Sequence, residues 1–73
     1  MRIEHDPDVD VAYIRLVGDI PPGEVSKTVP VEMSGPDLLI NLDLDIDGRL
    51  IGIEVLSASS ALRPETLSGG QTP

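Results

Sequence analysis

Residues 38–56 read LLINLDLDIDGRLIGIEVL, and this stretch decides the fold. Apolar side chains recur at every second position on both sides of Asp47-Gly48, which is the pattern of two half-buried strands. Asp-Gly is also a favoured pair for a two-residue type I′ turn between antiparallel strands. The stretch therefore predicts a β-hairpin with strands over residues 38–44 and 50–56.

The two-residue turn also fixes the register of this hairpin. It sets three apolar pairs on one face, namely Leu44–Ile51, Leu42–Ile53 and Ile40–Val55. A slip by one residue would expose one apolar row and bury the carboxylate of Glu54. The opposite, outer face also carries Leu39, Leu50 and Leu56. We therefore expect either a helix or a second copy of the chain to cover part of that face.

The same residues match a second pattern, the calcium loop D-x-[DN]-x-[DN]-G-x5-E of EF-hands. Asp43, Asp45 and Asp47 would supply single oxygens, and Glu54 would bind through both of its oxygens. An EF-hand needs helices on both sides of its loop, whereas these flanks alternate as strands. At the rise of a strand, Glu54 lies roughly 20 Å along the chain from Asp47. We interpret the stretch as a hairpin, with a weak cation site on Asp43, Asp45 and Asp47 as an alternative.

Three more strands are expected before the hairpin, over residues 2–5, 11–17 and 25–32. Asp6-Pro7-Asp8 has the composition of a turn, in which the Asp6 carboxylate accepts backbone hydrogen bonds. Pro30 cannot donate to a neighbouring strand, so residues 25–32 are expected at the edge of the sheet.

The C-terminal part of the chain changes character after Leu56. Ser57 is placed to cap a short helix over residues 58–62, which Pro64 would end. The predicted fold is therefore mainly β: a small antiparallel sheet of four to five strands built from hairpins, with a short C-terminal helix. It forms one domain over residues 1–63, followed by a flexible tail over residues 64–73.

Composition limits what such a domain can do. The chain has 73 residues, no cysteine and one aromatic residue, Tyr13, so its core is thin and oligomerisation is a common way to stabilise it. Its net charge of −8 repels phosphate backbones and argues against nucleic-acid binding. We find no targeting segment and no run long enough to cross a bilayer, so cytoplasmic residence without membrane contact is expected.

Two separated motifs resemble a family of short bacterial proteins, domain of unknown function 2283. The first runs from Ile3 to Leu16 and includes DVAYIRL at residues 10–16; the second is DLDIDGRLIGIEVLSAS at residues 43–59. The resemblance extends from about Met1 to about Leu62, and it implies a small, mostly β domain without established catalytic residues. Some members resemble antitoxin partners of small toxins. The link over residues 17–23, with Pro21-Pro22, is longer or more irregular than is usual in the family.

A candidate partner surface is expected on the outer face of the hairpin, formed by Asn41, Asp43, Asp45, Gly52 and Glu54. Arg15 would neutralise these acids if its strand is a neighbour. His5 is the only histidine, and no serine stands in a nucleophile motif. The sequence thus predicts no enzyme and no cofactor.

Three functions are compatible with these observations. The first is a non-catalytic protein–protein interaction module that is a homo-oligomer. The second is an acidic, antitoxin-like neutraliser of a small basic toxin, and the third is a weak calcium-binding hairpin.

Overall fold

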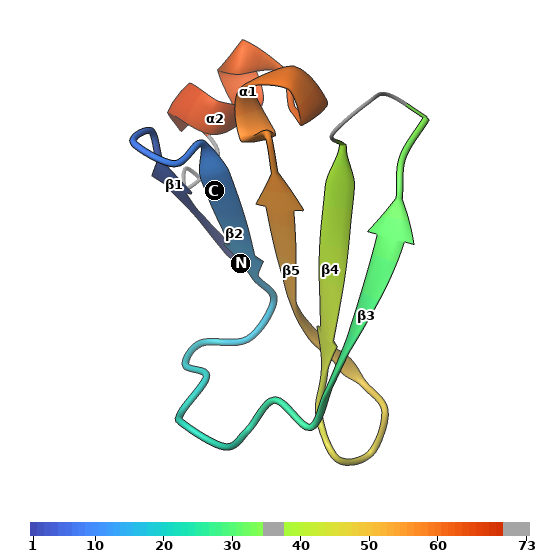
Figure 1. Ribbon diagram of the computed structural model, residues 1–73. Helices are drawn as coiled ribbons and strands as arrows, with labels where there is room; N and C mark the ends of the chain where they lie inside the picture. The colour runs from blue at the N-terminus through green and yellow to red at the C-terminus, as the bar shows by residue number, and fades with distance from the viewer. Residues whose placement is uncertain (35–37, 70–73) are drawn as a thin grey trace.

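The structure is a computed structural model that describes residues 1–34 and 38–69. Across these residues five strands form one antiparallel sheet in the order β1-β2-β5-β4-β3 (Figure 1). The strands are β1 (Arg2–Asp6), β2 (Val11–Arg15), β3 (Lys27–Glu32), β4 (Leu39–Leu44) and β5 (Leu50–Leu56). The predicted fold class is confirmed, and the central position of β5 brings the first hairpin beside the second.

The β1–β2 hairpin closes through the turn that the sequence predicts. The backbone N–H of Asp8 donates to the Asp6 carboxylate over 3.0 Å, as expected when an aspartate begins a turn. Asp10 completes the turn with a φ of 56°, in the left-handed region that aspartate tolerates better than most residues. This conformation directs the chain into β2.

The central hairpin keeps the predicted register along most of its length. Ile40 lies opposite Val55 and Leu42 opposite Ile53, as expected. The predicted pair of Leu44 with Ile51 is wrong, because Leu44 pairs with Leu50 across a β-bulge at Asp43/Leu44. A bulge adds one residue to one strand and shifts the pairing beyond it.

The cause of the bulge is the turn, which is not the predicted type I′. That turn type needs a positive φ at both central residues, but only Gly48 has one, at 81°. The Gly48 N–H donates to the Asp45 carbonyl over 3.0 Å, and the Asp45 N–H donates to the Arg49 carbonyl over 2.9 Å. The hairpin therefore has a three-residue loop in which glycine takes the left-handed position.

The edge position predicted for the Pro30 strand is confirmed, because β3 is the last strand of the sheet. Pro30 lies opposite Asn41, and the Met33 N–H donates to the Leu38 carbonyl. Hydrogen-bonded and non-hydrogen-bonded residues alternate along an antiparallel pair of strands. Because residue 33 bonds to β4, the nitrogen of Pro30 points away from β4, toward the free edge of the sheet. The missing N–H therefore costs the sheet no hydrogen bond.

Two short helices follow the sheet, α1 (Ala58–Ala61) and α2 (Pro64–Gly69). Pro64 was expected to end the first helix, but it begins the second, because proline needs no N–H partner at a first helical position. The tail predicted over residues 64–73 is therefore helical through Gly69, and residues 70–73 lie outside the described residues. Neither helix in the described chain is long and apolar enough to span a membrane.

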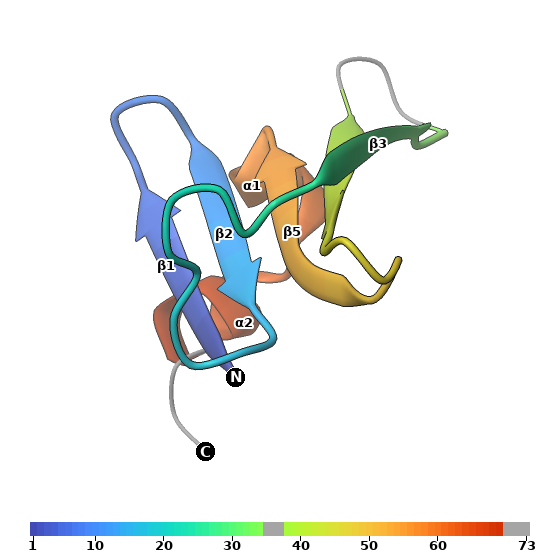
Figure 2. The same cartoon turned by 90° about the horizontal axis from the view of Figure 1, so that it is seen from below.

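The core lies between the sheet and these two helices. Successive side chains of a strand point to opposite faces, and the helices cover one of them, which we call the inner face. Ala12, Val55 and Ala58 form the buried centre. Packed around it are Ile3, Ile14, Ile40, Ile53, Ala61, Leu62 and Leu67. In Figure 2 both helices lie near β1, β2 and β5, and β3 lies away from them.

Candidate functional site

Tyr13 organises the outer face, the face that carries the predicted partner surface. It lies on β2 opposite Glu54 of β5. Its ring crosses the next outer position of β5, which is Gly52, and its hydroxyl donates to Asp43 Oδ2 of β4 over 2.7 Å. A Cβ at Gly52 would overlap the Tyr13 hydroxyl. The glycine is therefore needed so that the tyrosine can connect β2 to β4 across β5.

Other polar side chains of this face also bond to one another across the strands. Thr28 Oγ1 donates to Asp43 Oδ1 over 2.7 Å, and Asn41 Nδ2 donates to Glu54 Oε1 over 2.8 Å. The structure thus brings Asn41, Asp43, Gly52 and Glu54 together, but their polar groups bond to one another and to neighbouring strands. As arranged, these residues stabilise the sheet, and their role as a docking surface stays a prediction.

The environment of Tyr13 changes its acidity. Burial raises the pKa of its hydroxyl to about 12, and the hydrogen bond to the Asp43 carboxylate adds to the effect. If the hydroxyl lost its proton, the resulting phenolate could no longer donate to the Asp43 carboxylate, and two negative charges would lie close together. Tyr13 is therefore a neutral donor at physiological pH, not a base.

Arg15 does not neutralise the acids of the hairpin as predicted, although β2 and β5 are neighbours. Its Nε donates to Glu4 Oε1 of β1 over 3.0 Å. The guanidinium also lies 5.6 Å from the centre of the Tyr13 ring, within the range of a cation–π contact. Arg15 therefore stabilises the β1–β2 hairpin, and Tyr13 takes the bond to Asp43.

The three aspartates of the calcium pattern do not converge. Asp43 accepts from Tyr13 and Thr28 on the sheet. Asp45 Oδ1 accepts the backbone N–H groups of Asp47 and Arg49, over 3.0 Å and 2.9 Å. Among the described residues no three Asp, Glu or His side chains are grouped as metal ligands. The acids of this pattern form the turn and the sheet.

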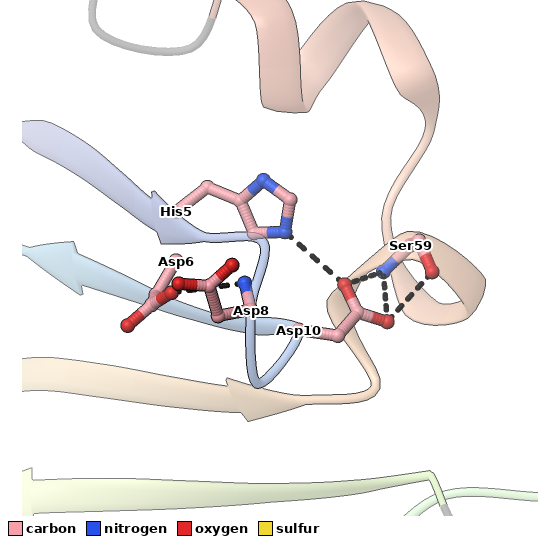
Figure 3. Close-up of polar contacts among 5 residues, drawn as sticks. All are labelled: His5, Asp6, Asp8, Asp10 and Ser59. Carbon is pink, nitrogen blue, oxygen red and sulfur yellow. Dashed lines mark hydrogen bonds and ion pairs between the residues drawn. The ribbon is translucent and has the colours of Figure 1, made fainter.

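A second polar cluster, which sequence reasoning missed, joins the β1–β2 turn to α1 (Figure 3). Asp10 Oδ1 lies 3.1 Å from Nε2 of His5. Asp10 also accepts from Ser59, whose N–H lies 3.1 Å from Oδ1 and whose hydroxyl lies 2.6 Å from Oδ2. The bond from the Ser59 hydroxyl and then that of His5 lower the pKa of Asp10. The carboxylate thus holds the start of α1 against the turn.

Asp10 performs the capping that the sequence assigned to Ser57. Ser57 precedes α1 with a φ of 52°, and its side chain makes no capping bond within the described helix. The Ala58 N–H donates to the Asp10 carbonyl over 2.9 Å, which adds a backbone bond to those of the carboxylate. The signal in the sequence was weak, because residues 10 and 59 are far apart along the chain.

The order of groups in this cluster decides what chemistry it supports. Serine activation needs a base that contacts the hydroxyl and is itself oriented by a third group. Here the carboxylate stands between the other two, so that His5 and the Ser59 hydroxyl both contact Asp10. The arrangement fits a structural cap and lacks the contact through which histidine would take the serine proton.

The fold and these clusters define a small single-sheet β domain whose outer polar residues bond across its strands. A family model described as Protein of unknown function (DUF2283) matches residues 2–59. The chain belongs to this family, as the sequence motifs predict. A search of curated proteins and a search of solved structures each gave no match.

Proposed function

We propose that this protein is a non-catalytic protein–protein interaction module that works as a homo-oligomer. The observation that carries the proposal is an apolar area on the inner face that no described helix covers. It is formed by Val29 and Val31 of β3 and Leu42 and Leu44 of β4, and we call it the open area. Val31 is exposed and the other three side chains are half-buried. None of these four side chains belongs to the core cluster beneath the helices.

The thin core supports the same proposal. Ala12, Ile51, Val55 and Ala58 are the buried apolar residues of the described chain, and no large side chain in it is fully buried. A domain of this size has little surplus of buried area from which to draw stability. Covering the open area with a second copy would supply the missing contact without another element in the chain.

Charge does not oppose self-association through the open area. The acids of these two strands, Glu32 of β3 and Asp43 of β4, lie at outer positions, whereas Lys27 is the ionisable residue of β3 and β4 that shares the inner face. The acids of β3 and β4 therefore lie on the opposite face of the sheet from this area. Two copies related by a two-fold axis would bring the same apolar side chains together.

The absence of catalysis is part of the proposal, and the Asp10 cluster supports it. His5 and Ser59 each contact the carboxylate, and the pKa of Asp10 is lowered, which makes it a weaker base. General bases near neutral pH need the opposite shift.

Sedimentation velocity at micromolar concentration tests the oligomer directly. We expect a species larger than the monomer of 7.8 kDa. Val31→Lys should shift the protein toward monomer, because a charge would be buried at the interface. Ile46→Lys is the matched control, since Ile46 is 84% exposed at the hairpin tip. A monomeric wild type would refute the homo-oligomer.

The acidic balance supports a second candidate function, the neutralisation of a small basic toxin. A net charge of −8 with acids along the outer face would attract a cationic partner. Native mass spectrometry of the protein drawn gently from its own cells tests this. Added mass from a small basic polypeptide would favour neutralisation, and bare homo-oligomer would favour the first proposal.

A further inference from the structure

The outer face carries an apolar groove at the end of the sheet nearest the helices. Its volume is about 540 Å³. Six apolar residues line it, namely Val9, Val11, Met33, Leu38, Leu39 and Leu56. The sequence left open whether a helix or a second copy of the chain covers Leu39 and Leu56. Because both helices pack on the inner face, these leucines remain for a partner.

The groove continues into an acidic hollow of about 380 Å³. Val9 and Val11 line both depressions, and the hollow adds the carboxylates of Glu4, Asp6 and Glu54. Arg2 and Arg15 already contact the Glu4 carboxylate over 3.1 Å and 3.0 Å, so Asp6 and Glu54 supply the negative charge of the hollow that a partner would meet. Glu32 lines the groove itself. Among the described residues that line either depression there is no lysine or arginine. One side of the groove is thus apolar and its surroundings are negative.

Charge decides between a second copy and a different partner for this groove. A second copy would bring its own net charge of −8 against carboxylates at the groove, which is unfavourable. A segment with lysine or arginine beside its apolar residues would pair with those carboxylates. The groove therefore favours a basic partner, whereas the open area of the inner face favours self-association.

The edges of the sheet indicate that such a segment is a helix. Strand addition needs a free edge with regular donors. On β3, a proline stands at residue 30, one of the positions whose backbone nitrogen points to the free edge of the sheet. The other edge strand, β1, is five residues long and carries charged residues at Arg2, Glu4 and Asp6. A helix can instead place its apolar side in a groove without using an edge.

We propose that the outer-face groove binds a basic amphipathic helix of a partner protein. The apolar side of the helix would lie against Met33, Leu39 and Leu56, and its cationic side would face Glu32 and the acids of the hollow. Val9 and Met33 are 66% and 42% exposed, so apolar side chains of the groove are accessible to a partner. This inference rests on the proposed role as an interaction module, and it does not depend on the homo-oligomer.

The test uses the full chain and a labelled helical peptide of about 16 residues, with leucine along one side and lysine along the other. Fluorescence anisotropy should show saturable binding that weakens as salt rises. Met33→Ser should weaken binding about fivefold or more through lost apolar contact. Glu32→Lys should weaken it about tenfold at low salt.

Two control variants and a control peptide separate the groove from general attraction. Ile46→Ser removes an exposed apolar residue at the hairpin tip, and Glu24→Lys makes the same charge change in the loop before β3. Both should bind like wild type. A scrambled peptide of equal composition should bind several times more weakly, because it cannot present one apolar side.

Several outcomes would overturn the inference. The inference is wrong if Glu32→Lys and Glu24→Lys lose the same amount of binding, or if the scrambled peptide binds as well as the helical one. It is also wrong if the dissociation constant of the helical peptide is weaker than about 1 mM. If sedimentation instead shows that Met33→Ser dissociates a homo-oligomer, a second copy occupies the groove. That result would refute the basic helix and leave a homo-oligomer standing, with its interface at the groove instead of the open area, whereas a monomeric wild type that binds the peptide would refute the homo-oligomer and leave the basic helix standing.

Discussion

Tyr13 is the residue whose position explains most of the outer face, because it connects three strands through one side chain. Its hydroxyl donates to Asp43 across Gly52. The sequence marked Tyr13 as the only aromatic residue, and it placed Asp43 and Gly52 on one face. It did not reveal their contact, because that depends on which strand lies beside β5, and a pattern along one strand does not contain the strand order.

The acidity of Tyr13 gives a clean prediction at this scale. Its pKa is raised to about 12 by burial and by Asp43, so phenolate absorbance near 295 nm should appear well above the ordinary midpoint of about 10. With no tryptophan or second tyrosine in the chain, this signal reports one group. Asp43→Asn should lower the midpoint, and an ordinary midpoint in the folded wild type would contradict the contact.

The same pKa sets a pH dependence of stability. The protonated form is favoured by folding, so the stabilisation is complete below the unfolded pKa near 10 and is lost as pH rises toward 12.

Gly52→Ala tests the close approach of the tyrosine ring to β5. The added Cβ would overlap the Tyr13 hydroxyl and lie 2.5 Å from Cζ, so the ring must move and lose its bond to Asp43. We expect a loss of about 1–3 kcal/mol in the free energy of unfolding, measured by urea denaturation.

Two further variants show whether this loss comes from the ring. Gly18→Ala is the matched control, because no described atom lies within 4 Å of its added Cβ, and it should change stability by less than about 0.5 kcal/mol. The pair Gly52→Ala and Tyr13→Ser should cost less than the sum of the single changes. Strict additivity would contradict the overlap.

At the scale of elements, local patterns predicted strands well and turns less well. Alternation in residues 38–56 gave both strands and most of their register, because one buried face tolerates no slip. The turn type was wrong because the Asp45 carboxylate accepts two backbone N–H groups and holds a three-residue loop. An Asp-Gly pair suits both loops, so the choice depends on the residue two positions before it.

The contact between the β1–β2 turn and α1 makes a prediction about acid stability. The pKa of Asp10 is lowered from 3.8, first by the Ser59 hydroxyl and then by His5. The charged carboxylate therefore stabilises the fold above pH 3.8, and this contribution is lost as pH falls through the lower folded value. Thermal melting between about pH 2 and pH 6 measures the change.

Asp10→Asn separates the charge from the backbone conformation, since asparagine also tolerates the positive φ of 56°. We expect the variant to be less stable than wild type near pH 6 and to lose less of its stability toward pH 2. Parallel melting curves for the two proteins over this range would show that the carboxylate does not hold α1.

At the scale of the whole molecule, the two faces of the sheet have different surroundings. The sequence indicated that the outer face is not wholly polar, but it could not say which face the helices cover. That depends on the direction in which the chain leaves β5. This direction is fixed by the positive φ of Ser57 and by the hydrogen bond from the Ala58 N–H to the Asp10 carbonyl. The groove beside Leu39 and Leu56 follows from this direction.

The helix layer itself supplies the last prediction. Leu67 of α2 packs on the core cluster, although residues 64–73 had the composition of a tail. Leu67→Ala should lower the free energy of unfolding by about 1–2 kcal/mol, less than for a fully buried leucine because Leu67 is half-buried. For a domain of this size, that corresponds to a melting temperature lower by roughly 5–15 °C.

Ile46→Ala is the control for this change, since it removes a side chain that is 84% exposed and should alter stability by less than about 0.5 kcal/mol. A chain shortened after Arg63 should lose at least as much stability as Leu67→Ala, because the contact of α2 is removed together with the leucine. If the shortened chain melts like the full chain, α2 adds nothing to the core. The core would then consist of the sheet and α1 alone, and the domain would depend still more on contacts with a second copy at the open area.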